Sequence, residues 1–170
     1  MPAMQRVVVL GSGGAGKSTL ARRLGDRLGL PVIHLDREHW QPGWVETPRD
    51  EWAKRVAELV SGDQWVIDGN YGGTMEARLR ACDTAIFLDL PRLLCLWRVV
   101  RRWQRYRGRT RPDMTSGCNE RLDWIFVRWI WNYPRLHRPA VVKHLATLGA
   151  DQRLVHLRSR RQVKEFMATL

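Results

Sequence analysis

Eight residues near the N-terminus constrain this chain more than any other feature. Gly11-Ser12-Gly13-Gly14-Ala15-Gly16-Lys17-Ser18 matches the pattern G-x-x-x-x-G-K-[ST] in full. An apolar run at residues 7–10 precedes the segment, and Leu20, Leu24 and Leu28 follow it at helical spacing. A strand that passes through such a turn into a helix is the context in which this pattern binds phosphate, because glycines let successive backbone N–H groups converge at the positive end of the helix. The sequence therefore predicts a phosphate-binding loop.

Each part of this loop has an expected role in holding a nucleotide. Lys17 is expected to reach the terminal phosphates, and the Ser18 hydroxyl is expected to bind Mg²⁺. Thr19 is expected to lie in the helix beside the nucleotide rather than to bind the metal. The other nucleotide contacts are expected from the loop backbone, at Gly11, Gly13, Gly14, Ala15 and Gly16.

Short apolar runs rich in valine and isoleucine alternate with helix-like stretches along the chain. This alternation is typical of an α/β fold in which a parallel sheet is covered by helices on both faces. We expect five strands, at residues 6–10, 32–36, 64–68, 84–89 and 153–157. The strongest helical periodicity predicts one apolar stripe that ends at Pro134 and consists of Leu122, Ile125, Phe126, Trp129, Ile130 and Tyr133.

Two segments interrupt this alternation. The first, at about residues 37–63, is rich in Trp and Pro. The second, at about residues 105–119, is rich in Arg, Gly and Pro. A chain of 170 residues has room for one ordinary domain, so we interpret the segments as insertions in a single domain. Insertions on such a sheet commonly close over a substrate. We expect the first to bind an acceptor and the second to form a small lid.

The charge of the chain is strongly basic. Its 29 Lys and Arg residues against 17 Asp and Glu give a formal charge of +12, and only four of the basic residues are lysine. Arginine forks suit phosphate oxygens, so the excess fits nucleic acid, a polyphosphate ligand or a genome rich in arginine codons. No apolar run approaches the roughly 20 residues of a membrane span. We expect a cytoplasmic protein without membrane contact, and the oligomeric state is left open.

Three aspartates are expected at the carboxyl ends of strands, where ligands bind in open α/β sheets. Asp68 precedes Gly69, which would allow a ligand to approach closely, and Asp36 opens the first insertion. A carboxylate at either position could hold Mg²⁺ or accept a proton from an attacking hydroxyl. Asp89 also ends a strand, but a turn or capping role is favoured there.

Seven arginines lie within residues 98–111. Arg98, Arg101, Arg102 and Arg105 follow the spacing i, i+3, i+4, i+7, which predicts one helix face, and Arg109 and Arg111 follow in the second insertion. This row could fold over a triphosphate and neutralise the transferring group. A nucleic-acid surface and a solvated basic face are the alternatives.

Several segments together resemble the adenylate-kinase-like P-loop kinases, and within them the bacterial DNA topology modulation protein-related family. Besides the phosphate-binding loop, these are His34-Leu35-Asp36 with Trp40-Gln41-Pro42-Gly43-Trp44, Trp65-Val66-Ile67-Asp68-Gly69-Asn70-Tyr71, Ile86-Phe87-Leu88-Asp89-Leu90-Pro91-Arg92, and Arg111-Pro112-Asp113-Met114 with Gly117-Cys118. The likeness extends from about Val7 to Phe166.

The resemblance implies a three-layer P-loop NTPase fold like that of nucleoside monophosphate kinases, with a five-stranded parallel sheet in the order 2-3-1-4-5. It also implies ATP as the phosphoryl donor. Arg98 would stack on the donor base, and Arg102 would touch its phosphates. Arg109 and Arg111, with Arg128, would clamp from the lid side, while Asp68 would reach Mg²⁺ through a bound water.

One departure concerns the acceptor. Adenylate kinases carry Asp-Gly-Phe-Pro-Arg after the third strand, whereas Asn70-Tyr71-Gly72 follows Asp68-Gly69 here. The arginine that binds the acceptor phosphate is therefore missing from its usual place, and Arg78 or Arg37 would have to replace it.

Two hypotheses from different classes follow. In the first, the chain is a kinase that moves the γ-phosphoryl group of Mg-ATP to a small-molecule acceptor, for instance a nucleotide or nucleoside. Asp36 then orients or deprotonates an alcohol acceptor, whereas a phosphate acceptor needs no base. In the second, the chain is a nucleotide-regulated, nucleic-acid-binding ATPase related to DNA topology, and it uses the surface of residues 98–111.

Overall fold

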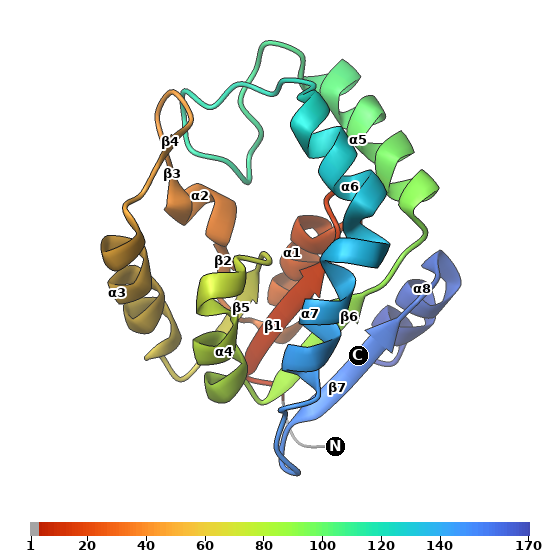
Figure 1. Cartoon of the computed structure of the whole chain (residues 1–170). Helices are drawn as coiled ribbons and strands as arrows, with labels where there is room; N and C mark the ends of the chain where they lie inside the picture. Colours follow the sequence, from red (N-terminus) through yellow and green to blue (C-terminus); the bar gives the residue numbers. More distant parts are fainter. Residues whose placement is uncertain (1–3) are drawn as a thin grey trace.

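A computed structural model describes residues 4–170 and contains a five-stranded parallel sheet (Figure 1). The sheet has the order β2-β5-β1-β6-β7, which confirms the predicted order 2-3-1-4-5. Four of the strands match their predicted bounds to within one residue. The strands are β1 (Arg6–Gly11), β2 (Val32–His34), β5 (Trp65–Asp68), β6 (Thr84–Leu88) and β7 (Arg153–Leu157).

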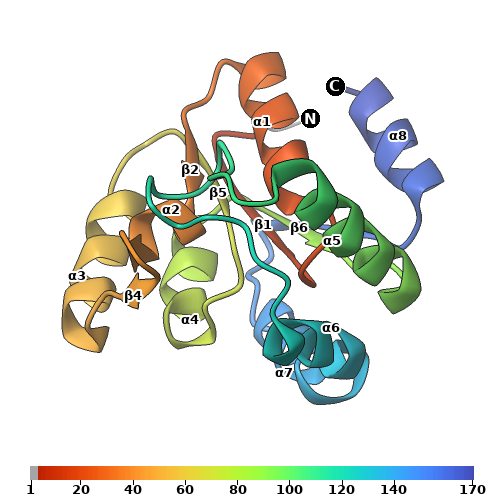
Figure 2. The ribbon, with the colours of Figure 1, turned by 90° about the horizontal axis from the view of Figure 1, so that it is seen from above.

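Helices cover both faces of this sheet (Figure 2). In that view α1 and α8 lie on one side of the sheet, and α6 and α7 lie on the other. The helices are α1 (Lys17–Leu28), α2 (Leu35–His39), α3 (Arg49–Val60), α4 (Gly72–Ala81), α5 (Arg92–Tyr106), α6 (Trp124–Leu136), α7 (Arg138–Leu145) and α8 (Arg160–Ala168). No helix within residues 4–170 is long and apolar enough to cross a bilayer.

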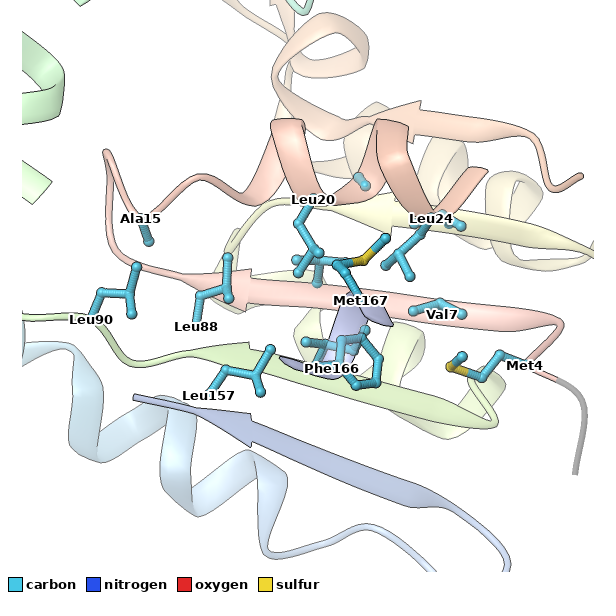
Figure 3. Packing of buried hydrophobic residues seen from close by; sticks show 14 of the residues in the cluster. Met4, Val7, Ala15, Leu20, Leu24, Leu88, Leu90, Leu157, Phe166 and Met167 are labelled. Carbon is cyan, nitrogen blue, oxygen red and sulfur yellow. The ribbon is translucent and has the colours of Figure 1, made fainter. Parts of the chain in front are cut away.

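The central strand β1 sends its side chains alternately into two cores. Val7 and Val9 pack in the cluster that includes Leu20 and Leu24 of α1 and Phe166 and Met167 of α8 (Figure 3). Val8 and Leu10 pack in the other cluster, with residues of α4 and α7. Because β1 is covered on both faces, it needs an unbroken apolar run, and the run holds the following loop rigidly.

The second strand corrects the sequence analysis, because β2 ends at His34 and Asp36 lies in the short helix α2. Leu35 is fully buried against Gly69, where an added Cβ would lie 2.8 Å from the Leu35 Cβ. The chain therefore turns into the core at Leu35 instead of continuing the strand. Asp36 still lies just beyond the carboxyl end of the sheet.

The two segments that interrupt the alternation differ in regular structure. The first includes most of α2, the two-stranded sheet β3 (Trp40–Gln41) and β4 (Val45–Glu46), and α3. The second is the loop of residues 107–123 between α5 and α6, which we call the 107–123 loop. Isolated bridges between Arg107 and Glu120 and between Thr110 and Asn119 draw its two ends together.

Candidate functional site

The phosphate-binding loop connects β1 to α1, as the sequence predicted. Gly14 and Gly16 have φ angles of +75° and +96°, a region that glycine adopts without strain. An added Cβ on Gly14 would lie 2.2 Å from the Cys95 carbonyl oxygen, and one on Gly13 would lie 2.5 Å from Cζ of Phe126. These glycines are therefore required by the backbone conformation and by the close approach of α5 and α6.

Lys17, the first residue of α1, lies across this loop. Its Nζ donates to the carbonyl oxygens of Gly11 and Ser12, at 3.0 Å in each case. Burial lowers the pKa of Lys17 despite the opposing charges of Asp36 and Asp68, and the charge of Arg102 lowers it further. The ammonium group is thus held among carboxylates and a guanidinium that come from three other elements.

Ser18, Asp68 and His34 form a chain of hydrogen bonds beside the loop. The Ser18 hydroxyl donates to Asp68 Oδ2 at 2.7 Å, and His34 Nδ1 lies 2.5 Å from Asp68 Oδ1. Burial lowers the pKa of His34, but the hydrogen bond and charge of Asp68 outweigh it, so the net pKa is raised. Asp113 of the 107–123 loop joins this group: burial raises the pKa of its carboxyl, yet Arg111, a backbone N–H, His34 and the Ser18 hydroxyl lower it below its ordinary value.

The donors at Ser18 and Asp68 fit a magnesium ion. No group of three or more His, Cys, Asp or Glu side chains within the described chain could hold a metal alone. Mg²⁺ does not require such a cage, because it commonly takes one or two protein oxygens and completes its shell with water and substrate phosphates. A hydroxyl and a carboxylate 2.7 Å apart at the loop match that requirement.

The backbone after β5 is fixed to the loop by Asn70 and Arg78. The Asn70 side chain accepts from Gly11 N at 3.1 Å and donates to Gly11 O at 2.7 Å. Arg78 is fully buried and donates to the carbonyl oxygens of Gly69 and Tyr71, at 2.8 and 3.1 Å, and of Asn70. Burial lowers the pKa of Arg78 to about 10. Arg78 therefore supports the backbone, and the suggestion that it replaces an acceptor-phosphate arginine is wrong.

Asp36 faces an aromatic group that combines His39 and Trp52 of the first insertion with Tyr71, which follows β5. The Tyr71 hydroxyl donates to Asp36 Oδ1 at 2.7 Å. Burial and the Asp36 carboxylate raise the pKa of Tyr71, so its hydroxyl stays protonated. The rings of His39, Trp52 and Tyr71 lie against one another with centroids 4.7 to 5.1 Å apart. The group supplies flat apolar walls next to one oriented carboxylate.

Trp40 and Trp44 of the same insertion pack edge to face, with ring centroids 5.4 Å apart. Trp44 also donates from Nε1 to the Asn119 carbonyl at 3.3 Å. The Thr115 hydroxyl donates to Arg37 O at 2.7 Å, and Gly43 N donates to Gly117 O at 3.3 Å. The 107–123 loop therefore rests directly on the first insertion.

The predicted single arginine face of α5 divides in the structure, which corrects the sequence analysis. Arg98 donates from Nη1 to Ala15 O at 2.9 Å, and Arg102 donates from Nε to Glu120 Oε1 at 3.0 Å. Arg101 and Arg105 are exposed and lie over the rings of Trp97 and Tyr106. Of the four, Arg98 therefore contacts the phosphate-binding loop and Arg102 contacts the 107–123 loop, whereas Arg101 and Arg105 stay at the surface.

The two arginines predicted in the lid also divide into one that is buried, Arg111, and one that is exposed, Arg109. Arg111 is buried and pairs through Nε with Glu120 Oε2 at 2.7 Å. Arg109 is exposed, as is Thr19 in the first turn of α1. The structure thus gathers Lys17, Ser18, Asp36, Asp68, Arg98, Arg102 and Arg111 around the loop, and leaves Arg109 and Thr19 at its surface.

The sequence analysis gave no role to five residues of the site, which are His34, Asn70, Tyr71, Asp113 and Glu120. Glu120 lies one residue beyond the predicted second insertion, and its signal was an isolated acid in an arginine-rich segment. Asn70 and Tyr71 stand where adenylate kinases carry other residues, so the departure from that pattern was the signal.

Similarity to known proteins agrees with this geometry. No protein-family model matches the chain. A shikimate kinase of Rhodopseudomonas palustris (strain ATCC BAA-98 / CGA009) is 33% identical over 122 residues, which cover 63% of this chain and 60% of that protein. A shikimate kinase of Bradyrhizobium diazoefficiens (strain JCM 10833 / BCRC 13528 / IAM 13628 / NBRC 14792 / USDA 110) is 31% identical over 114 residues, which cover 58% of this chain and 55% of that protein. The chain thus matches 60% or less of the length of these curated relatives.

Solved structures agree over nearly the whole chain. A shikimate kinase from Acinetobacter baumannii in complex with shikimate has a TM-score of 0.62 and 15% identity, and the match covers 98% of this chain and 90% of that one. The chain has a P-loop kinase fold. A shikimate kinase from Bacteroides thetaiotaomicron gives a TM-score of 0.53 at 20% identity, covering 98% and 96%. A sugar kinase from Janibacter sp. HTCC2649 has a TM-score of 0.51 and 20% identity, and the match covers 98% of this chain and 93% of that one.

Proposed function

We propose that this protein transfers the γ-phosphoryl group of Mg-ATP to a hydroxyl group of a small-molecule acceptor. The observation that carries the proposal is the position of Asp36. Its carboxylate lies close enough to Lys17 to counteract the lowered pKa of the ammonium, while Tyr71 occupies only Oδ1. Oδ2 can therefore receive an acceptor hydroxyl next to the phosphates.

On the donor side, the backbone amides of the loop and Lys17 bind the terminal phosphates of ATP. Ser18 and Asp68 hold Mg²⁺, which neutralises charge on the phosphates when it is bound. Arg98, already at the loop through Ala15, contacts the donor base. Arg102 and Arg111 neutralise the charge that develops on the transferred group, and Arg109 joins them from the surface.

On the acceptor side, Asp36 orients the hydroxyl and takes its proton as the hydroxyl oxygen bonds to the γ-phosphorus and the bond from that phosphorus to the ADP oxygen breaks. The aromatic residues of the first insertion enclose the acceptor, and the 107–123 loop acts as a lid over it. Insertion and lid belong to one domain and touch each other directly. Closure of this kind excludes water that would otherwise compete for the phosphoryl group.

The curated relatives support a hydroxyl rather than a nucleotide as acceptor. Both are shikimate kinases, and shikimate is a hydroxylated carboxylic acid. The structure also lacks support for an acceptor phosphate at Arg78, whose guanidinium is bound to backbone carbonyls. Shikimate and related hydroxy acids are therefore the first acceptors to test.

The nucleic-acid alternative has less support. Arg98, Arg102 and Arg111 turn toward the phosphate-binding loop or toward buried Glu120, so they are withdrawn from the surface that the alternative requires. The resemblance to the DNA topology modulation protein-related family stays a prediction from sequence, as does the cytoplasmic location.

The acceptor is identified by incubating the protein with Mg-ATP and a panel of shikimate, other hydroxy acids, sugars, nucleosides and nucleoside monophosphates. We expect one hydroxyl compound to raise ADP release above the acceptor-free rate. Asp36→Asn should then lower kcat for that compound by about 10²- to 10⁴-fold, the usual contribution of a general base. Asp63→Asn, at an exposed position before β5, is the matched control and should leave kcat unchanged. Stimulation by monophosphates alone, or by no compound, would contradict the proposal.

A further inference from the structure

We propose that Glu120 is a positioning residue that aims Arg102 and Arg111 at the transferred phosphoryl group. The inference rests on the proposed function and assigns a role to the one buried acid of the 107–123 loop that bridges two arginines. Glu120 is only 6% exposed. Its Oε1 accepts from Arg102 Nε at 3.0 Å, and its Oε2 pairs with Arg111 Nε at 2.7 Å.

The nitrogen of each guanidinium that Glu120 contacts determines which other nitrogens can bind a phosphate. An arginine can bind an anion through Nε and one Nη, or through its two Nη atoms. Here both arginines face Glu120 with Nε, Arg102 in a hydrogen bond and Arg111 in an ion pair. Within residues 4–170 the Nη atoms of Arg102 hydrogen-bond to no protein atom, and Arg111 uses only Nη1, in a long 3.3 Å contact with Asp113. The outer edges of both groups therefore stay free for phosphate oxygens.

Geometry places the pair beside the phosphate-binding loop. Arg102 lies about one turn of α5 beyond Arg98, whose Nη1 donates to Ala15 O of that loop at 2.9 Å. Glu120 joins Arg111 to this turn of α5.

Glu120 also allows two like charges to stand together. Burial lowers the pKa of Arg102, the charge of Arg111 lowers it further, and the charge and hydrogen bond of Glu120 oppose both effects. Without the carboxylate, the two guanidinium groups would repel each other in a poorly hydrated place. We expect them to separate or to turn toward solvent.

The backbone holds Glu120 at this position. Glu120 N donates to Arg109 O at 2.9 Å, and residue 120 forms the bridge with Arg107 where α5 ends. One arginine comes from the last turns of α5 and the other from the 107–123 loop, so Glu120 connects the two elements. A residue in this place can set arginine direction without touching substrate itself.

The test compares the wild type with Glu120→Gln, which keeps the shape and one acceptor oxygen but loses the charge. Glu165→Gln is the matched control, because Glu165 forms an exposed pair with Arg161 on α8, with Nε 2.6 Å from Oε1. With the acceptor found above, we expect Glu120→Gln to lower kcat at least tenfold and to change the acceptor KM less than twofold. The control should change neither. Glu120→Asp, which keeps the charge but is one methylene shorter, should recover part of kcat.

Circular dichroism and thermal melting identify folded variants before kinetics are measured. If Glu120→Gln does not fold, Glu120→Asp decides, and a kcat equal to that of the wild type overturns the inference. A folded Glu120→Gln variant with wild-type kcat also overturns it, as does a rise in acceptor KM with unchanged kcat. A wild-type protein that binds no Mg-ATP and phosphorylates no acceptor overturns the proposed function, and this role of Glu120 with it. If the wild type is active and the Glu120 variants have its kcat, only the proposed role of Glu120 is overturned.

Discussion

At the scale of single residues, the site depends on polar side chains that are buried with their partners. Asp68 accepts from Ser18 and pairs with His34, and Asp36 accepts from Tyr71. Burying such groups is costly unless each is hydrogen-bonded, so these pairs fix the direction of the groups. The sequence predicted Asp36 and Asp68 from their places near strand ends. It could not predict Tyr71 or His34 as their partners, because these contacts join residues about 35 positions apart.

The pair of His34 and Asp68 predicts how stability varies with pH. The folded-state pKa of His34 is raised above its ordinary value of 6.5, so protonation favours the folded state. The resulting stability is fully present below about pH 6.5 and is lost as pH rises through the higher folded-state pKa. We therefore expect His34→Gln to lower the Tm more at pH 5.5 than at pH 8.5, measured by thermal melting of both proteins. An equal loss at both pH values would show that the pair carries no charge.

At the scale of elements, apolar runs predicted the strands well because β1, β5 and β6 are buried on both faces. The same reasoning was less successful for α6. Phe126, Trp129, Ile130 and Tyr133 pack inward as predicted, but Ile125 is 80% exposed, and the helix passes Pro134 to end at Leu136. Periodicity shows that a helix has an apolar side, whereas the edge of the buried stripe depends on the neighbouring element. Here that element is α5, whose path the local sequence does not specify.

The contact between the phosphate-binding loop and α5 can be tested with Gly14→Ala. The φ angle of +75° costs a non-glycine residue about 1–2 kcal/mol, and the new Cβ would meet the Cys95 carbonyl at 2.2 Å. Gly29→Ala is the matched control, because Gly29 has a φ of +69° and nothing within 4 Å of an added Cβ. We expect urea unfolding to show a loss of about 1–2 kcal/mol for the control and a clearly larger one for Gly14→Ala. Equal losses would mean that α5 does not hold the loop.

At the scale of the whole molecule, the sheet brings β1, β2 and β5 to a common edge, and the two irregular segments meet above it. The sequence analysis located both segments along the chain, at about residues 37–63 and 105–119. It did not predict that Thr115 donates to the Arg37 backbone or that Trp44 donates to the Asn119 backbone. Such contacts join segments about 75 positions apart. The predicted second insertion ended at residue 119 and therefore left out Glu120, which connects α5 to the 107–123 loop.

Phosphorus NMR of the protein with Mg-ATP and its acceptor tests the proposed phosphoryl transfer most directly. We expect ADP and a phosphate monoester of the acceptor to form in equal amounts, and we expect Lys17→Met to abolish both signals. Lys54→Met, at an exposed position of α3, should leave them unchanged. ADP that forms together with inorganic phosphate alone, at a rate that no acceptor alters, would contradict the account.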